Sequence, residues 1–418
     1  EARERIGGRV YTDDSFGYPI DLGGSWIHDT DTSVLTSLVT EKGIHTYEFN
    51  YENAKNYSTL LSESDFNSMI TELPTMVSEY MTFYTKKVSD STDDLSIAEV
   101  VDAFLKDKSY NDKQLALLKT YLMNEVEGDI GNKTELLSAK ESGITELRRR
   151  FLQTERDDLL MKDGYINLFT DLTEGIDIKY SSEVSSITQK DNEVSVTTKA
   201  GTAYTADYVI VTVSLGVLKK KEITFDPALS EKKVEAIDLL GMGVYEKIAI
   251  EFEEVFWDDA NVLQFYENPP TAFGYGVNFN KVLGKKTLVF LISGNGKYFP
   301  EYYTLSESEI QKTLVDYLKL IFPEASIVPK RSLITNWKND QFSYGSYSSY
   351  APGSTPTNRR EFEENEGRVY FAGEHTSIEN YASVDGAYLS GESTAKKIID
   401  DSGEASNNGR SIKFAGLA

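Results

Sequence analysis

Apolar and polar residues alternate along this chain with two different periods. Between residues 178 and 214 the apolar residues recur at every second position, and Asp191-Asn192 and Ala200-Gly201 provide turns. This pattern predicts a β-meander that leads into a buried strand at Tyr208 to Val213. Residues 62–155 instead carry apolar residues at helical spacing. The chain is therefore expected to combine sheets with helices.

Shorter signals extend this prediction to other parts of the chain. Residues 20–28 predict a strand that runs into a glycine-rich turn, and residues 33–43 predict a helix with a glycine at its end. Residues 246–257 and 286–294 have the pattern of strands, and an amphipathic helix is expected near 306–321. Strands that alternate with helices in this way favour an α/β fold.

The composition excludes several classes of function. The chain has 418 residues, no cysteine and three histidines, so we expect no disulfide, no thiolate nucleophile and no metal site. No apolar run reaches the roughly 18 residues that a membrane span needs, so no membrane partner is expected. The formal charge of −24 argues against a nucleic-acid partner and would steer cations toward the protein.

The first ten residues have features of a dinucleotide site. Glu1 is expected at the end of a strand, and Gly7-Gly8 at a tight turn. In dinucleotide folds an acidic residue at the end of the second strand binds the ribose hydroxyls, about 20 residues after a G-x-G-x-x-G turn. No segment of this sequence supplies that fingerprint. We therefore expect the first β-α-β unit to be missing, and the 418-residue chain to bind a dinucleotide poorly.

A second candidate site lies near the end, in "GRVYFAGEHTSIENYASVDGAYLSGESTAKKI", residues 367–398. The strand from Arg368 to Phe371 is expected to deliver Gly373 and Glu374 to a large anionic cofactor. The helix that follows would direct its N-terminus at the same cofactor, because a helix N-terminus favours negative charge.

Five blocks of the sequence together resemble one family. They are "EARERIGGRV" (1–10), "DLGGSWIH" (21–28), "ADYVIVTVSLGVLK" (206–219), "NWKNDQFSYGSYSSYAPG" (336–353) and "GRVYFAGEHTS" with "VDGAYLSG" (367–391). In this order they resemble the flavin-containing amine oxidases, with a pattern closest to polyamine oxidases of fungal and plant type. The resemblance covers residues 1 to about 400.

This resemblance implies an α/β fold in which a Rossmann-like FAD-binding domain, without its N-terminal β-α-β unit, is interleaved with an α+β substrate domain. The expected FAD-binding domain consists of residues 1–48, 155–219 and 330–402. The expected substrate domain consists of residues 49–154 and 220–329. The Ser/Asn/Gly-rich residues 403–418 are expected to form a flexible tail.

The resemblance also implies which residues hold FAD. Glu1 would bind the adenosine ribose, Val184 would offer backbone groups to adenine, and Val384 would donate its amide to the flavin. Ser346 stands where monoamine oxidases carry a flavin-linked cysteine, so FAD is expected to be non-covalent. The other cofactor residues that the resemblance implies are Arg3, Gly8, Arg9, Gly23, Gly24, Ser25, Trp26, Trp337, Gly373, Glu374 and Ser383.

Three residues are implied in the chemistry at the flavin. Lys247 would hold a water against flavin N5, although the sequence alone also allows an exposed strand residue. Tyr347 matches one wall of an aromatic cage around the substrate nitrogen, and His28 lies near the amine unless it is a structural histidine. The opposite cage wall matches Ser383, so the cage is expected to be half-built, which weakens a monoamine oxidase assignment.

Carboxylates in the substrate domain point to a polyamine substrate. Glu127 and Asp129 match positions that contribute to the substrate tunnel, and a polycation needs such partners because an unpaired buried ammonium is costly. The alternative for both residues is a solvated loop. The implied reaction oxidises spermine, spermidine or acetylated forms by hydride transfer to flavin N5, followed by imine hydrolysis and reoxidation by O2 to hydrogen peroxide.

Three other classes share the implied fold. An L-amino-acid oxidase needs an arginine after the Gly23-Gly24 turn, and none is present there. A chromatin lysine demethylase would need a helical insertion and a further helical domain, which 418 residues do not accommodate. A non-catalytic flavin- or steroid-binding relative stays open, because Ser383 departs from the pattern and the dinucleotide fingerprint is absent.

Overall fold

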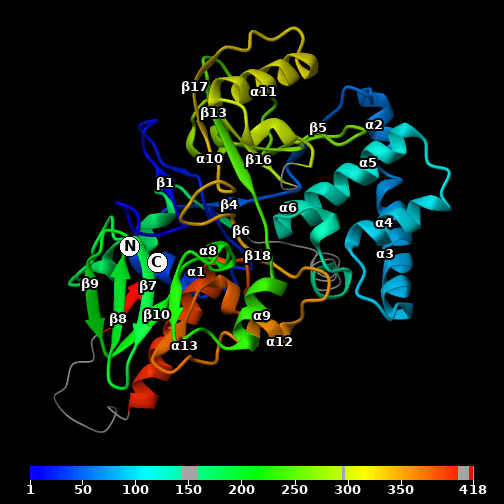
Figure 1. The fold of residues 1–418 in the computed structure, drawn as a ribbon. Helices are drawn as coiled ribbons and strands as arrows, with labels where there is room; N and C mark the ends of the chain where they lie inside the picture. The colour runs from blue at the N-terminus through cyan, green and yellow to red at the C-terminus, as the bar shows by residue number, and fades with distance from the viewer. Residues whose placement is uncertain (144–157, 294–296, 403–413, 418) are drawn as a thin grey trace.

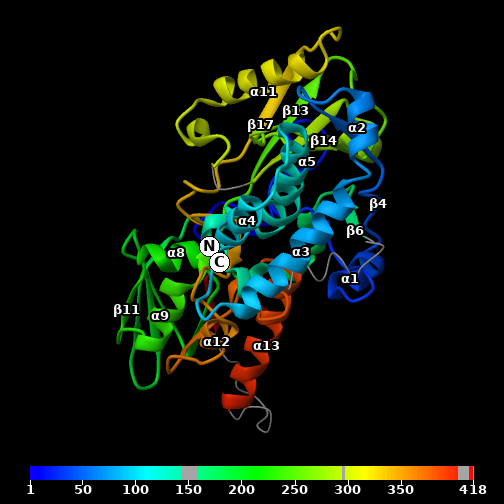
Figure 2. The ribbon, with the colours of Figure 1, turned by 90° about the vertical axis from the view of Figure 1, so that its right-hand side faces the viewer.

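The computed structural model describes residues 1–143, 158–293, 297–402 and 414–417. A parallel sheet with an antiparallel meander lies at the lower left of Figure 1, a larger sheet with helix α11 lies at the top, and a group of helices lies at the right. The view turned by 90° shows the same three parts (Figure 2). This arrangement confirms the mixed α/β architecture.

The parallel sheet is centred on β10 (Tyr208–Val211). This strand pairs in parallel with β19 (Val369–Phe371) on one side and with β20 (Phe414–Leu417) on the other. From the sequence we expected a flexible tail beyond residue 402. In the structure the backbone of residues 414–417 pairs with the second edge of β10. Residues 403–413 lie outside the described residues.

The meander that the two-residue period predicted is present. It consists of β7 (Val184–Gln189), β8 (Val194–Thr198) and β9 (Ala203–Ala206), and β11 (Thr224–Asp226) extends it in the order β11-β7-β8-β9. The inward residues of β8, such as Val194 and Val196, pack with the buried valines of β10 in one hydrophobic cluster. The meander therefore shares a core with the parallel sheet.

The larger sheet has the strand order β17-β13-β16-β15-β14-β5. Residues 54–57 pair here with strands from residues 246–334, so an early segment of the chain completes a sheet formed by later ones. Helix α11 (Glu307–Ile321) begins with a capping box formed by Ser306 and Glu309 and packs its apolar face on this sheet. The six strands are β17 (Pro329–Ile334), β13 (Glu246–Phe252), β16 (Thr287–Ile292), β15 (Tyr275–Asn278), β14 (Val262–Phe265) and β5 (Ala54–Tyr57).

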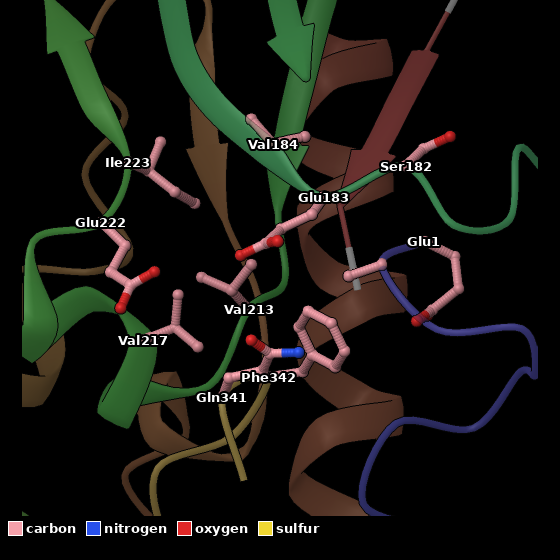
Figure 3. A pocket seen from close by; sticks show the side chains of 11 residues that line it. Glu1, Ser182, Glu183, Val184, Val213, Val217, Glu222, Ile223, Gln341 and Phe342 are labelled. Carbon is pink, nitrogen blue, oxygen red and sulfur yellow. The ribbon is translucent and has the colours of Figure 1, made fainter. Parts of the chain in front are cut away.

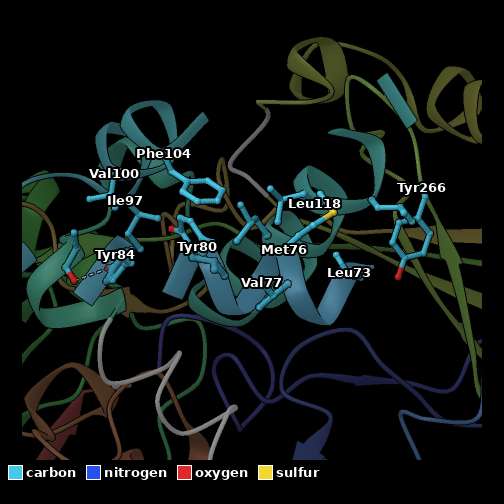
Figure 4. Packing of buried hydrophobic residues seen from close by; sticks show 14 of the residues in the cluster. Leu73, Met76, Val77, Tyr80, Tyr84, Ile97, Val100, Phe104, Leu118 and Tyr266 are labelled. Carbon is cyan, nitrogen blue, oxygen red and sulfur yellow. Dashed lines mark hydrogen bonds between the residues drawn. The ribbon is translucent and has the colours of Figure 1, made fainter. Parts of the chain in front are cut away.

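The helical group fills most of residues 62–143. Apolar residues at helical spacing, including Met76, Tyr80 and Tyr84, form a buried cluster between the helices (Figure 4). Its helices are α2 (Glu63–Met69), α3 (Leu73–Asp90), α4 (Ile97–Lys106), α5 (Asp112–Leu122) and α6 (Gly128–Ile130). A π-helical turn (Met123–Glu127) joins α5 to α6. In the described ranges no helix has the length and apolar character that a membrane span requires.

Short elements connect these parts and surround the candidate site. Helix α1 (Val34–Lys42) ends at Gly43 in the left-handed conformation, as its glycine predicted. Helix α13 (Val384–Ser402) follows β19. The remaining short strands and helices are β1 (Thr12–Asp13), β2 (Ile20–Asp21), β3 (Trp26–Ile27), β4 (Thr46–Phe49), β6 (Asp158–Met161), β12 (Gly241–Met242), β18 (Ser348–Ser349), α8 (Leu215–Lys220), α9 (Glu231–Leu239), α10 (Phe279–Leu283) and α12 (Pro356–Arg360).

Candidate functional site

Lys247, near the start of β13, is a buried ammonium group with only 4% of its surface exposed. Its Nζ donates to the carbonyl oxygens of Asp21 at 2.9 Å and Gly23 at 2.7 Å, and also to the hydroxyl of Ser25. It lies 5.4 Å from the centre of the Trp26 ring. Burial lowers the pKa of Lys247 to about 8, against the opposing effect of the Asp21 carboxylate. A lysine in this state can exchange a proton near neutral pH.

Asp21 is a site residue that the sequence did not point to. Its carboxylate is buried and accepts hydrogen bonds from Thr12 and from the backbone N–H of Tyr165. Burial raises the pKa of Asp21, while these two hydrogen bonds act in the opposite direction. Asp21 directly precedes the glycine turn, and its backbone carbonyl also holds Lys247. Its position in the sequence, next to the glycine turn, could have marked Asp21 as a site residue.

The glycine turn at Gly23 and Gly24 allows three segments to meet. A Cβ on Gly23 would lie 1.8 Å from the backbone oxygen of Arg9, so no other residue fits here without moving the backbone. A Cβ on Gly24 would lie 3.0 Å from Val384 Cγ2. Gly8 has a φ of +54° and open space beside it. The turn thus brings the start of the chain and the start of α13 against the Lys247 site.

Arg9 and Glu374 form an ion pair that joins the same segments. Arg9 Nη1 lies 2.7 Å from Glu374 Oε1 and also donates to the carbonyl of Ser346 at 2.9 Å. Glu374 accepts further bonds from the Ser348 hydroxyl at 2.6 Å and from the Ala382 N–H at 2.9 Å. Burial raises the pKa of Glu374, but Arg9 and Ser348 contribute to a larger opposite effect that lowers it to about 2. Glu374 is therefore an ionised buried carboxylate at physiological pH.

The N-terminus of α13 lies where the sequence predicted it. The Ser383 hydroxyl accepts from the Gly386 N–H at 3.0 Å and donates to the Asn380 carbonyl at 2.7 Å, so Ser383 caps the helix. The residue before it, Ala382, has a φ of +61°, which is unusual for a residue with a side chain. Such strain is concentrated at functional sites. The hydroxyl of Ser383 is thus engaged in capping the helix.

The residues expected around adenosine line one pocket. Glu1 and Val184 lie on its wall together with Ser182, Val213 and Phe342 (Figure 3). Its volume is about 40 Å³. Val213 lies two residues beyond the end of β10, so the pocket lies at the carboxyl end of the parallel sheet, where nucleotides bind in open α/β sheets.

Two other residues expected at the cofactor have protein partners. Arg3 makes two hydrogen bonds to the carboxylate of Asp340, at 2.9 and 2.7 Å. Trp337 is buried and donates its indole N–H to the carbonyl of Leu22 at 3.0 Å. Both contacts hold the loop after β17 against the N-terminal segment and the strand before the glycine turn.

Tyr347 belongs to an aromatic pair. Its ring meets the ring of Tyr245 edge to face, with the centroids 6.3 Å apart, and its hydroxyl donates to the carbonyl of Gly128 at 3.1 Å. We expected a half-built cage from the match of Ser383, and Tyr245 was not considered. Tyr245 precedes Lys247 by two residues, so the two-residue period of a strand could have indicated that both lie on one face.

Glu127 is buried and already paired. Its Oε1 accepts from the backbone N–H of Thr134 at 2.9 Å, from the Thr134 hydroxyl at 3.0 Å and from Lys297 Nζ at 3.1 Å. The side chain of Glu127 is 1% exposed and that of Lys297 is 29% exposed. Burial lowers the pKa of Lys297, but Glu127 and Glu135 outweigh this and raise it. Asp129 lies on α6, and its side chain is outside the described part.

His28 follows β3 and has a polar environment. Its Nδ1 lies 2.6 Å from Asp158 Oδ2, and the hydroxyl of Tyr51 donates to the same oxygen at 2.6 Å. The side chain of His28 is 49% exposed, whereas that of Asp158 is buried. Asp158 therefore fixes the orientation of a histidine that solutes can reach.

The donor set fits a large dinucleotide cofactor. The glycine turn and the start of α13 lie against Lys247. The carboxylate residue Glu1 lines a pocket at the carboxyl end of the parallel sheet. The indole N–H of Trp26, next to Lys247, is buried and has no hydrogen-bond partner in the described residues. Among those residues, no cluster of three or more His, Asp or Glu side chains could hold a metal ion.

Comparison with known proteins identifies relatives across almost the whole chain. Residues 1–399 match a family described as flavin containing amine oxidoreductase. Polyamine oxidase 4 of Oryza sativa subsp. japonica is 32% identical over 96% of this chain and 84% of its own length. Polyamine oxidase 2 of Arabidopsis thaliana is 32% identical over 97% of this chain and 84% of its own length.

One more curated relative and one solved structure are also similar to this chain. Lysine-specific histone demethylase 2 of Homo sapiens is also 32% identical, over 95% of this chain but only 50% of its own length. The solved structure of a putrescine oxidase bound to putrescine has a TM-score of 0.73 and covers 96% of this chain and 92% of its own. At 19% identity, this second likeness supports the fold alone.

Proposed function

The chain belongs to the family of flavin-containing amine oxidoreductases, and we propose that within this family it oxidises polyamines. Membership makes the protein an FAD-dependent amine oxidase. The proposed substrates are spermine, spermidine or their acetylated forms. When bound, FAD supplies a hydride acceptor for the carbon next to the substrate nitrogen and passes the electrons to O2, and the oxidised amine then hydrolyses.

The observation that carries the proposal is the environment of Lys247. A buried ammonium held by the carbonyls of a glycine turn is suited to position a water molecule or to exchange a proton there. Its lowered pKa makes the neutral amine accessible at mildly alkaline pH. Ser25 shares the same contact and fixes the direction of Nζ. We assign Lys247 to proton and water handling beside the flavin ring.

Other residues of this chain would hold and orient the two reactants. Glu1 and Val184 would hold the adenosine end of FAD, and the helix start at Val384 would hold the flavin end. The pair of Tyr347 and Tyr245 would orient the amine, because an ammonium is attracted to aromatic faces. The retained contacts of Arg9 would keep these segments together.

The substrate class rests on the polar residues farther from Lys247. His28 is held by Asp158 and remains accessible, which suits a contact with an amine. Glu127 Oε1 accepts from Lys297, so a polyamine ammonium bound at this oxygen would replace the Lys297 Nζ. Lys297 can turn toward solvent because its side chain is partly exposed. We propose that Glu127 and Asp129 receive the distal charge of a polyamine in this way.

Values of kcat/KM for spermine, N1-acetylspermine and benzylamine test this assignment. A polyamine oxidase should use at least one of the two polyamines far better than benzylamine, which offers a single ammonium. Anaerobic bleaching of the flavin absorbance by each amine separates reduction of the flavin from reoxidation. Preference for benzylamine would rule out the polyamine assignment and leave the broader amine oxidase activity in place.

A second candidate is an oxidase for amines with one charge. The pairing of Glu127 with Lys297 favours it, because a carboxylate that already has a cationic partner offers less to a distal ammonium. The same three substrates distinguish the two candidates.

A further inference from the structure

We propose that Arg359, a buried residue of α12, is a positioning residue that fixes the start of α13 for the cofactor. It acts on the backbone at Tyr381 and Ala382, which lies directly before that helix and its cap. The inference rests on the proposal above that the helix start at Val384 holds the flavin end of FAD.

Arg359 is an arginine with few polar partners. Its surface is 0% exposed. Its Nη1 donates to the Ser348 hydroxyl at 2.8 Å and to the His375 carbonyl at 3.0 Å. Its Nε and Nη2 have no hydrogen-bond partner in the described ranges. Because burial of a guanidinium with so few partners is costly, the contacts that Arg359 does make indicate its role.

The first route from Arg359 to the helix is polar. The Ser348 hydroxyl, which accepts from Arg359, donates to Glu374 Oε2 at 2.6 Å. The same carboxylate oxygen accepts from the backbone N–H of Ala382 at 2.9 Å. A hydroxyl has a single hydrogen, and one that accepts from a guanidinium must direct this hydrogen elsewhere. Arg359 therefore orients Ser348 toward the carboxylate that holds the Ala382 amide.

The second route passes through aromatic rings. The Cζ atom of Arg359 lies 4.2 Å from the centre of the Tyr381 ring and 4.4 Å from the centre of the Tyr350 ring. These two rings meet edge to face with their centroids 5.0 Å apart. A guanidinium is attracted to aromatic faces and stacks on them. Arg359 thus also holds Tyr381, the residue directly before Ala382.

Both routes meet at a backbone conformation that needs support. Ala382 has a φ of +61°, which is unfavourable for a residue with a Cβ. Such a conformation persists only where the surroundings impose it. The bond from the Ala382 N–H to Glu374 and the stacking of Tyr381 on Arg359 provide these surroundings.

The first turn of α13 follows the position of this backbone. A Cβ on Gly386 would lie 1.9 Å from the carbonyl oxygen of Asn380, so the loop before the helix is in close contact with its first turn. Val384 of the same turn lies against Gly24 in the glycine turn. A change at Ala382 would therefore move the helix start relative to the glycine turn and to the cofactor between them.

The test changes Arg359 and measures two properties that do not involve an amine. They are hydrogen exchange of the Ala382 amide without FAD, and FAD affinity from a titration followed by flavin fluorescence. Arg359→Met should speed exchange and weaken FAD binding, each by roughly tenfold or more, since hydrogen bonds of a charged group are lost. Arg359→Lys should recover part of both, because it restores a cation without the planar guanidinium.

A second substitution separates positioning from general stability. Ala382→Gly removes the Cβ that makes the positive φ unfavourable. In this background Arg359→Met should weaken FAD binding several-fold less than it does in the parent. An equal loss in both backgrounds would overturn the proposal, because the role of Arg359 would then not pass through the conformation of residue 382.

Arg360→Met provides the matched control. Arg360 is the next residue of α12 and is exposed, so neither property should change. The amide of Ile248 in the larger sheet should keep its protection in every variant that is folded. Ser348→Ala breaks the polar route with a smaller change in volume, and it should have the same two effects if Arg359→Met does not fold.

The two measurements identify which step fails. Unchanged exchange at Ala382 would overturn the link from Arg359 to this backbone. Faster exchange with unchanged FAD affinity would overturn its role toward the cofactor, together with the assignment of Val384 to the flavin end. Neither measurement depends on amine turnover, so a preference for benzylamine would change the polyamine assignment alone.

Discussion

Lys247 and Glu127 are both buried and charged, yet their surroundings are opposite. The hydrogen bonds of Lys247 in the described structure go to two carbonyls and a hydroxyl, which carry no net charge. Glu127 instead receives an ammonium and two hydrogen bonds from Thr134. Burial without a contacting counter-charge disfavours the charged form of Lys247, whereas Glu127 has the Lys297 ammonium as a contacting counter-charge.

The difference separates two uses of buried charge. A lysine whose pKa is lowered toward 7 can take part in proton transfer, so Lys247 has the surroundings of a residue that acts in the reaction. A buried ion pair mainly adds a specific contact whose loss exposes an unpaired charge. Glu127 therefore has the surroundings of a structural residue, unless a substrate displaces Lys297. Substitutions of both residues test whether Lys247 acts in the reaction and whether Glu127 is structural.

The largest effect is expected for Lys247→Met. Removing a general acid or base typically slows catalysis by about 100- to 10,000-fold. The flavin spectrum should be retained, because Met preserves the length and apolar stem of the side chain. Rapid mixing with amine under anaerobic conditions, and then with O2, assigns the loss to reduction or reoxidation.

A surface lysine provides the control for this variant. Lys319→Met removes an ammonium from α11 whose side chain is 55% exposed, and turnover should stay unchanged. Unaltered rates in Lys247→Met for both half-reactions would remove Lys247 from the mechanism and with it the contrast with Glu127.

The next effect concerns the stability of the Glu127 pair. Lys297→Met leaves a buried carboxylate without its ammonium and should lower the free energy of unfolding by about 3 kcal/mol. Glu127→Gln should cost less, because it leaves no buried charge and Lys297 can reach solvent. The double variant should resemble Glu127→Gln rather than the sum of both changes. Urea unfolding, followed by tryptophan fluorescence, measures all three.

An exposed pair gives the matched control. Lys55 and Glu63 lie 3.4 Å apart with side chains 40% and 80% exposed, so Lys55→Met should cost below about 1 kcal/mol. Equal losses for Lys55→Met and Lys297→Met would show that burial of Glu127 does not set the cost.

Glu374 extends the comparison to a second paired carboxylate and gives a pH dependence. Its pKa is lowered from 4.5 to about 2 in the folded protein, so its stabilising contribution is present above pH 4.5 and is lost as pH falls toward 2. The difference corresponds to about 3 kcal/mol. Glu374→Gln should therefore be less stable than the parent at pH 6 and approach it at pH 2.5. Urea midpoints across this range measure the change, and parallel curves would contradict the assignment.

The sequence predicted the elements better than the contacts between them. The two-residue period located the β-meander, and the glycines located the end of α1 and the turn at Gly23 and Gly24. These features depend on local backbone preferences, so a single segment reveals them. The start of α13 was likewise visible from the segment that follows β19.

Long-range partners were not visible in this way. Lys297 lies 170 residues from Glu127 in the chain, and nothing local marks it as the partner. Tyr165 binds Asp21 across 144 residues, for the same reason. Pairing of β20 with β10 depends on a strand edge that only the folded sheet creates. Contacts of this kind are decided by tertiary packing rather than by the pattern of one segment.

The smallest effect is expected from salt, and it tests Glu127 from another direction. The net charge of −24 should accelerate association with polyamines, and about 0.15 M salt screens charges beyond roughly 8 Å. We expect kcat/KM for spermine to fall several-fold between 20 mM and 300 mM NaCl, and that for benzylamine to fall less, since steering grows with the charge of the ligand.

Glu127→Gln should leave the steepness of this decline unchanged if the carboxylate stays paired with Lys297, because a neutralised buried pair contributes little to the field outside the protein. A shallower decline in Glu127→Gln than in the parent, with a selective loss for spermine, would instead show that the substrate displaces Lys297 and that Glu127 faces the polyamine. Steady-state kinetics of both proteins with both amines at the two salt concentrations decide between these outcomes.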